Sequence, residues 1–269
     1  MNTRTDVSRA ARKAGDSRPL QWLARAGFAA SGLLHLMLGY LAIQVAVQHS
    51  GQSDQSGALA QVASLPAGVV LLWLMTIGFF ALALSLLAEA VVGVGSSSKK
   101  RWVRSLVPLG KAIAYIALGF TALTFAQGGS ADASSSTASA SADLLRMPGG
   151  QLLLGLVGAL AFGVGVFLVV KGVRRKFEED IVVPSGAAER PVVILGIVGY
   201  VAKGIAIAVV GILFIVAAVK VDASEATGLD GALKSLAELP FGVAILITVG
   251  VGLIAYGVYS FARARLARL

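Results

Sequence analysis

The chain has 269 residues, of which 57% are hydrophobic and only 14% are charged, and its mean hydropathy is +0.82. Soluble domains usually carry about 25% charged residues, so this composition excludes an ordinary soluble domain and indicates an integral membrane protein. The net charge of +9 comes from basic residues beside apolar runs rather than along one polar face, which excludes nucleic acid as a partner. The absence of cysteine excludes disulfides, thiol catalysis and iron–sulfur ligation.

Apolar runs recur along the whole chain, at about 20–47, 66–93, 104–126, 149–171, 192–219 and 240–262. Backbone groups in hydrocarbon must be paired within the protein, so each run predicts a transmembrane α-helix. A β-barrel would need alternating segments of about ten residues, which are absent. The first run is too long for the apolar region of a signal peptide, so we expect it to remain as a span.

The basic residues predict the orientation of these spans. Lys and Arg crowd the N-terminal tail, the second and fourth connections and the C-terminus, whereas the other connections hold only Arg146, Lys220 and Lys234. Both termini are therefore expected in the cytoplasm, in a multi-pass protein of the bacterial plasma membrane. Residues 1–19 read as a disordered basic tail that contacts anionic lipid headgroups or only fixes the topology. The serine-rich segment 128–143 reads as a flexible outer loop.

A unit of two helices is repeated three times. Each even-numbered span begins at a proline, and each odd-numbered span carries a glycine 27 or 29 residues before that proline; the pairs are Gly39 and Pro66, Gly119 and Pro148, and Gly211 and Pro240. Short amphipathic runs precede the prolines. The sequence therefore predicts an all-α polytopic fold with six transmembrane helices in three pseudo-threefold hairpin repeats, at 20–98, 99–180 and 181–269, forming one membrane domain.

This layout resembles an actinobacterial family of membrane proteins, the domain-of-unknown-function family twelve-oh-six. Its unit has an aromatic and a basic residue in the first helix, followed by a glycine. "GYVAKGIAIAVVG" at 199–211 is similar to that pattern, and "LGKAIAYIALG" at 109–119 is a looser match. "GFAASGLLHLMLG" at 27–39 departs from it, with Ser31 at the basic position. The resemblance covers residues 20–266 and implies the fold and the copy number, but no activity.

Two lysines lie inside apolar spans at the same register. Aligning the repeats on their glycines gives two matched positions four residues apart: Ser31, Lys111 and Lys203 at the first, and His35, Tyr115 and Ile207 at the second. On a helix this spacing traces one stripe. One reading is that both lysines extend to the inner interface, paired with Glu89, the only acidic residue within a span. The other is that they line a cytoplasm-facing cavity and attract an anionic solute or headgroup.

His35 lies near the middle of its span, where an ionisable group is a candidate proton relay or a neutral ring bonded to a neighbouring helix through Tyr115. Tyr256 and Tyr259 read as interfacial or packing aromatics. No phosphate loop, metal-binding helix or paired carboxylates occur, so we expect no catalytic residue, no metal, no cofactor and no enzyme activity.

Two functions remain open from the sequence. The first is a small-solute carrier or channel whose anion preference is set by Lys111 and Lys203. The second is a scaffold, assembly factor or accessory subunit that packs through its glycine-rich faces against a protein partner or a second copy. Few polar residues occur in the outer halves of the spans, which favours the second reading because a pore needs a polar lining.

Overall fold

The computed structural model describes residues 18–48, 52–94 and 101–268, and within these ranges every regular element is a helix apart from one isolated β-bridge. Six helices are long and apolar enough to cross a membrane, which confirms the predicted spans. The first helix begins at Arg18, so the last two residues of the expected tail are helical. The rest of that tail, residues 1–17, lies outside the described residues.

Each repeat consists of a long helix, a short helix and a second long helix. Repeat 1 contains α2 (Arg18–Gln48), α3 (Gln55–Ala63) and α4 (Gly68–Val94). Repeat 2 contains α5 (Arg101–Ala126), α6 (Ala133–Arg146) and α7 (Gly150–Val173). Repeat 3 contains α8 (Glu189–Lys220), α9 (Gly228–Ala237) and α10 (Gly242–Leu266). Short 3-10 turns are η1 (Lys176–Asp180) at the end of repeat 2, and η2 (Gly186–Ala188) and η3 (Ala223–Glu225) in repeat 3. Pro66, Pro148 and Pro240 each stand two residues before the second long helix.

The serine-rich segment 128–143 is not a flexible loop, because most of it forms α6. Asp132 caps this helix by accepting a hydrogen bond from the amide of Ser135 at 3.0 Å. That hydrogen bond, with a second from the Ser135 hydroxyl, lowers the pKa of the Asp132 carboxyl below its ordinary value. A capping side chain satisfies a backbone N–H group at the start of a helix and so favours helix in a serine-rich segment. The composition of the segment does not reveal this cap.

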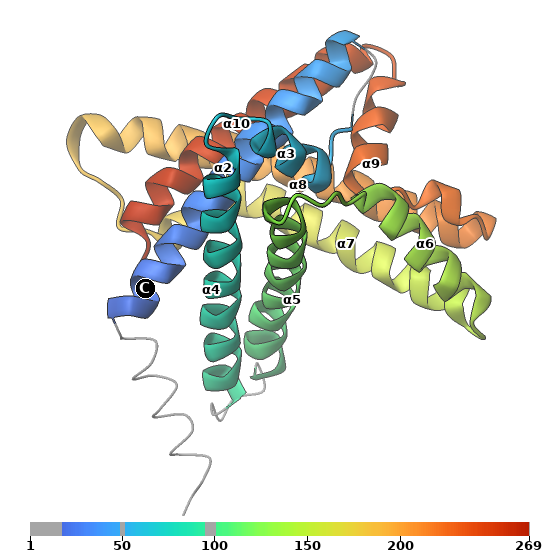
Figure 1. Ribbon diagram of the computed structural model, residues 1–269, viewed down its shortest axis with the longest axis horizontal. Coiled ribbons are helices and arrows are strands. Elements are labelled where there is room, and N and C mark those ends of the chain that lie inside the picture. Colours follow the sequence, from blue (N-terminus) through green and yellow to red (C-terminus); the bar gives the residue numbers. More distant parts are fainter. Residues whose placement is uncertain (1–17, 49–51, 95–100, 269) are drawn as a thin grey trace, which may run out of the picture.

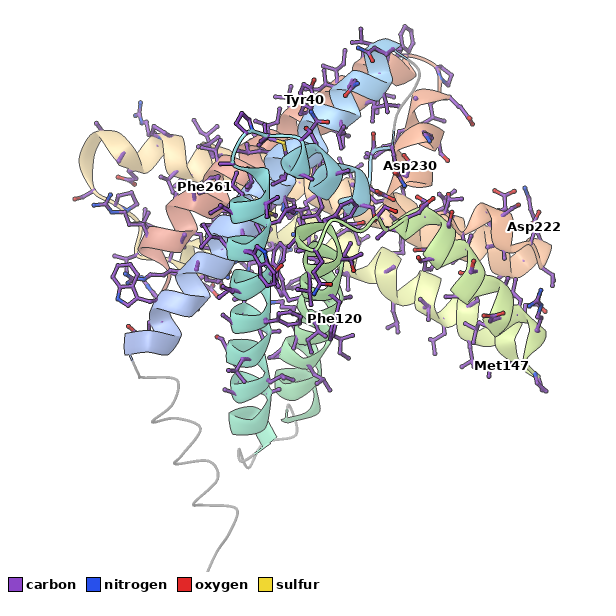
Figure 2. The ribbon with its side chains drawn as sticks, in the orientation of Figure 1. Tyr40, Phe120, Met147, Asp222, Asp230 and Phe261 are labelled. Atoms are coloured by element: carbon purple, nitrogen blue, oxygen red, sulfur yellow. The ribbon has the colours of Figure 1, made fainter. Side chains whose placement is uncertain are left out.

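Hydrogen bonds between the short helices join the three repeats into one layer, which we call the short-helix side of the bundle. The Ser53 amide donates to Asp230 at 2.7 Å, linking repeats 1 and 3. The Ser134 hydroxyl donates to Asp54 at 3.0 Å, linking repeats 2 and 1. Lys234 neutralises Asp230 at 2.7 Å, and Figure 2 places Asp230 where the short helices meet. The opposite side, where α2 begins and α10 ends, is the terminal side.

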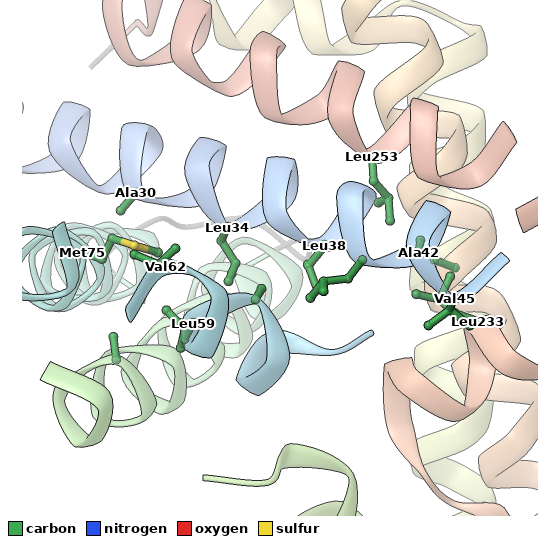
Figure 3. Close-up of a cluster of buried hydrophobic side chains, with 14 of the residues drawn as sticks. Ala30, Leu34, Leu38, Ala42, Val45, Leu59, Val62, Met75, Leu233 and Leu253 are labelled. Carbon is green, nitrogen blue, oxygen red and sulfur yellow. The ribbon is translucent and has the colours of Figure 1, made fainter. Parts of the chain in front are cut away.

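The long helices pair between repeats. Figure 1 shows α4 beside α5, α7 beside α8, and α10 beside α2, and these are the three most extensive helix contacts in the described structure. The second helix of each repeat thus packs along the first helix of the next, and the order closes on itself. A hydrophobic core fills the space under the short helices (Figure 3), with side chains from α2, α3, α4, α9 and α10 that include Leu38, Leu59, Met75, Leu233 and Leu253.

Small residues seven positions apart bring the paired helices into close contact. In the α2–α10 pair, Gly32 and Gly39 face Gly257 and Gly250; in the α7–α8 pair, Gly158 and Gly165 face Gly211 and Gly204. A Cβ on Gly39 would lie 2.5 Å from the carbonyl oxygen of Gly250. Membrane helices gain no hydrophobic free energy by associating in lipid, so this backbone proximity is what allows dispersion contacts to hold the pairs together.

Repeat 2 lacks the glycines that bring the two long helices of one repeat together. In repeat 1, Gly27 of α2 meets Gly78 of α4, and in repeat 3, Gly252 of α10 meets Ala202 of α8. The positions in repeat 2 that correspond to Gly27 and Gly78 hold Val107 and Leu160, which are 48% and 62% exposed. Accordingly, α2 packs on α4 and α8 packs on α10, whereas α5 and α7 barely touch. The pseudo-threefold bundle is open along one side.

We predict that Gly165→Ala destabilises the protein whereas Gly163→Ala, in the same helix, does not. A Cβ at position 165 would lie 2.5 Å from the backbone nitrogen of Ala208, so α7 and α8 must separate, at a cost of about 1–3 kcal/mol. A Cβ at position 163 meets no atom within 4 Å. Equilibrium unfolding in mixed micelles, followed by circular dichroism, measures both. Equal unfolding midpoints for the two variants would show that the glycine contact does not hold α7 to α8.

Candidate functional site

A cleft of about 340 Å³ lies where the three repeats meet, and we call it the central cleft. Repeat 3 supplies most of its wall, through one stripe of α8. The lining residues are Leu34, His35, Leu38 and Gln55 from repeat 1, Leu118 and Thr137 from repeat 2, and Lys203, Ala206, Ile207, Val210, Phe214, Gly228, Leu229 and Leu253 from repeat 3. Gln55, Thr137 and Gly228 belong to the short helices, so one end of the cleft lies at the short-helix side. A volume above roughly 300 Å³ is typical of small-molecule sites.

The other end of the cleft, its floor, carries Lys203 and His35, and both contact the Tyr256 ring. The Lys203 ammonium lies 4.2 Å from the centre of the Tyr256 ring, a cation–π contact. The His35 ring centre lies 4.6 Å from the same ring. His35 Nδ1 is 2.7 Å from the Ser31 carbonyl oxygen, which can only accept, so Nδ1 carries a proton. His35 Nε2 is then the ring nitrogen left for other partners.

An aromatic cluster of Phe177, Tyr200, Tyr256 and Tyr259 closes the bundle between this floor and the terminal side. Phe177 stacks on Tyr200 with ring centres 5.4 Å apart and meets Tyr259 edge-on at the same distance. Tyr200 meets Tyr256 edge-on at 5.3 Å. All four side chains are buried. Phe177 comes from the connection between α7 and α8, and it enters the cluster against Gly196, where a Cβ would overlap its ring. The central cleft therefore ends at packed aromatic rings.

Asp180 holds the same connection to the cluster. Its carboxylate pairs with Lys171 at 2.5 Å and with Arg263 at 3.7 Å. Arg263 also donates to the Tyr200 hydroxyl at 3.3 Å and lies over the Phe28 ring at 4.4 Å. The backbone adds two hydrogen bonds, from Val182 to Leu266 and from Arg268 to Asp180. The connection between α7 and α8 is thus fixed to the end of α10.

The structure brings together only part of the set predicted from the sequence. Lys203 and His35 share the central cleft, and Ser31 is buried beside His35 at 3.5 Å. Lys111 is exposed and does not line the cleft. The reason is that its neighbour Ala112 is fully buried on the α4 side of α5, while α5 has no second long helix packed against it. The matched position of repeat 2 is therefore exposed, whereas that of repeat 3 lines the cleft.

Two other expected contacts are also replaced. Glu89 is exposed and, within the described ranges, pairs with neither Lys111 nor Lys203. The acidic residue that does pair with cations near the span ends is Asp180, whose partners are Lys171 and Arg263. Tyr115 stacks near Phe79, with ring centres 6.1 Å apart, rather than on His35, whose aromatic neighbour is Tyr256. Lys171 and Arg263 share a repeat position with Glu89, because each lies 23 residues after the proline of its repeat. This shared spacing is the sequence feature that marks Lys171 and Arg263 as candidates for an intramembrane ion pair.

We predict that Asp180→Asn lowers the free energy of unfolding by about 1.5–3 kcal/mol, the range for hydrogen bonds to charged groups. The reason is that Lys171 and Arg263 lose their carboxylate partner while their side chains remain only 14% and 21% exposed. Trypsin should then cleave faster after Arg174 and Arg175, both exposed in the connection between α7 and α8. Asp143→Asn is the matched control: its pair with Arg146 is 76–80% exposed, so removing it should change stability by less than about 1 kcal/mol. Equal trypsin sensitivity of the two variants would contradict the role given to Asp180.

Comparison with known proteins agrees with the repeat structure. The family model described as Domain of Unknown Function (DUF1206) matches residues 26–93, 108–175 and 198–267, one match in each unit of long, short and long helix. The chain is 30% identical to "Uncharacterized protein YxxB" of Bacillus subtilis (strain 168) over 242 residues, which cover 88% of this chain and 87% of that protein. No solved structure matches the chain. The chain therefore belongs to the DUF1206 family and is a multi-span membrane protein built from three copies of its repeat.

Proposed function

We propose that this membrane protein is a small-solute carrier that binds an anion in the central cleft, with Lys203 as the cationic group and without an enzymatic reaction. The observation that supports this most directly is the state of Lys203. Its ammonium lies at the floor of a cleft, and among the described residues it forms no ion pair with an acidic side chain. Lysines within a membrane are usually paired or line a polar pathway.

A carrier fits the geometry better than an open channel. A channel needs a polar path through the whole membrane, but the aromatic cluster closes the central cleft below Tyr256. In a carrier, access alternates between the two sides by movement of one part of the bundle against the rest. Here α5 makes at most marginal contact with α7 and α8, so the α4–α5 pair is the part best placed to move relative to them.

We further propose that the termini face the cytoplasm in the bacterial plasma membrane. The exposed basic residues Arg174, Arg175 and Arg265 lie on the terminal side, as the positive-inside rule requires. The end of the cleft at Gln55, Thr137 and Gly228 then faces outward. This reverses the expectation of a cytoplasm-facing cavity, because the short helices leave space at their side whereas the aromatic cluster fills the other.

A scaffold or accessory subunit is the second candidate, and the open side of repeat 2 is the observation that favours it. Figure 2 shows apolar side chains such as Phe120 and Met147 on the outside of the bundle, and both are 59% exposed. Lipid covers such surfaces in a membrane, and so could a helix of a protein partner or of a second copy. A partner that remains bound at fixed stoichiometry to the purified wild-type protein, and is lost when Val107 and Leu160 are changed to lysine, would support this function instead.

Cysteine labelling tests the orientation, because the chain has no cysteine of its own. Ser139→Cys lies on α6, and Glu179→Cys lies in the connection between α7 and α8; both native side chains are exposed. We expect a membrane-impermeant maleimide to label position 139 in intact cells and position 179 only after the cells are permeabilised. The reverse labelling pattern would show that the termini face outward.

Thermal unfolding in lipid nanodiscs tests the proposed anion site. An anion bound at about 100 times its Kd should stabilise the wild-type protein by about 2.7 kcal/mol. We expect organic anions, but not matched cations, to raise the melting temperature, and Lys203→Met to abolish this effect. Lys111→Met removes the cation at the matched position outside the cleft and should leave the effect intact. Absence of any anion effect, or equal loss in both variants, would contradict the proposal.

A further inference from the structure

We infer that the occupant of the central cleft is a membrane-derived single-chain carboxylate, a fatty-acid-type anion that enters from the lipid between α5 and α8. This inference rests on the proposed anion site and names its ligand class. It depends on three features of the cleft: apolar walls, one cationic end and an open side.

The walls of the cleft suit an extended hydrocarbon chain rather than a hydrated ion. Between Lys203 and Phe214, the α8 stripe continues with Ala206, Ile207 and Val210, and Leu118 lines the cleft from α5. Within this stripe, every lining side chain beyond Lys203 is apolar. Along this stripe, a small hydrated anion would have to give up its water without new hydrogen bonds from the α8 side chains, which is costly. An acyl chain that enters this stripe from water gains free energy, and one that enters from lipid loses none.

The length of the cleft sets the length of the chain. Eleven residues separate Lys203 from Phe214, and a helix rises 1.5 Å per residue, so the stripe is about 16 Å long. An extended chain advances about 1.2 Å per bond, from the 3.6 Å that three backbone bonds span. A carboxylate at Lys203 would therefore place about a dozen carbons between Lys203 and Phe214, where the short helices begin to line the cleft.

Repeat 2 gives the ligand a path from the lipid. α5 packs along α4 and touches α3, but it makes at most marginal contact with α7 and α8. The cause is local, because Val107 and Leu160 replace the glycines that close the other two repeats. Leu118 on α5 and the α8 stripe consequently face one cleft without a helix contact to seal it. An amphiphile dissolved in the bilayer can reach this cleft without crossing the aqueous phase.

Binding of tritiated laurate, a carboxylate with twelve carbons, to the full chain in phosphatidylcholine nanodiscs tests the inference, with empty nanodiscs as the partition background. We expect saturable binding that unlabelled laurate displaces. Acetate has the charge without the chain, and dodecanol has the chain without the charge, so each should compete at least about tenfold less well. Lys203→Met should weaken laurate binding by about tenfold or more, and Lys111→Met should not change it.

Leu118→Trp provides a second, independent variant in case Lys203→Met fails to fold. It fills the cleft from α5 without touching the floor, so it should abolish laurate binding while acetate-dependent stabilisation persists. If acetate competes as well as laurate, or phosphatidylglycerol in the nanodisc displaces laurate, the ligand class is wrong but the anion site remains. If dodecanol binds as well as laurate, the charge plays no part and the inference fails. If no anion binds in a manner that depends on Lys203, both the inference and the proposed function fail.

Discussion

The close approach of helix backbones at small residues is the interaction on which the rest of this structure depends. In lipid, a leucine against a leucine gains little over a leucine against an acyl chain, so large side chains do not drive helix association. Gly32, Gly39, Gly204 and Gly211 remove the side chain where a neighbouring backbone passes, and carbonyl oxygens lie where a Cβ would be. Because the two glycines of each helix are seven residues, or about two turns, apart, they lie on one face and fix an antiparallel partner.

The same rule explains why three similar repeats do not make a symmetric molecule. Each contact between repeats uses glycine: those of α2 and α8 meet the backbone of their partner helices, and Gly119 of α5 meets the Phe80 ring of α4. The contacts within a repeat use glycine only in repeats 1 and 3. Repeat 2 therefore lacks its internal contact, so α5 stays with α4 and α7 stays with α8. A space lined by all three repeats is left where strict symmetry would have placed a packed axis.

These two kinds of contact also decide how much could be predicted from the sequence. The spans and their copy number follow from hydropathy and from the spacing of Gly39, Gly119 and Gly211 to their prolines, which are local properties of the chain. Which side of a helix faces inward depends on its neighbours, so the matched register of Lys111 and Lys203 did not predict their different surroundings. Recognising Val107 and Leu160 as substitutions of a contact glycine would have shown the difference.

The aromatic cluster and the ion pairs of Asp180 could not be predicted from the sequence for another reason. Asp180 lies in a connection, 9 residues along the chain from Lys171 but 83 from Arg263, and only the fold brings the three together. Tyr256 looked like a packing residue because nothing in its own helix shows that His35 and Lys203 will face its ring. Periodicity identifies a buried face, whereas the chemistry of a site arises from which faces meet.

The intramembrane cations show three different solutions to the same electrostatic problem. Lys111 is exposed near the end of its span, where its ammonium can extend toward the interface. Lys171 has a carboxylate at 2.5 Å. Among the residues that the structure describes, the charged partner of Lys203 is replaced by the Tyr256 ring. A cation–π contact contributes about 0.5–2 kcal/mol, whereas a lysine in the middle of a membrane helix costs about 2.5–3.5 kcal/mol. The ring therefore offsets part of the cost, and the anion proposed for the central cleft would offset the remainder. An anion supplies more than water does in a low-dielectric cleft, because the Coulomb attraction there is least screened.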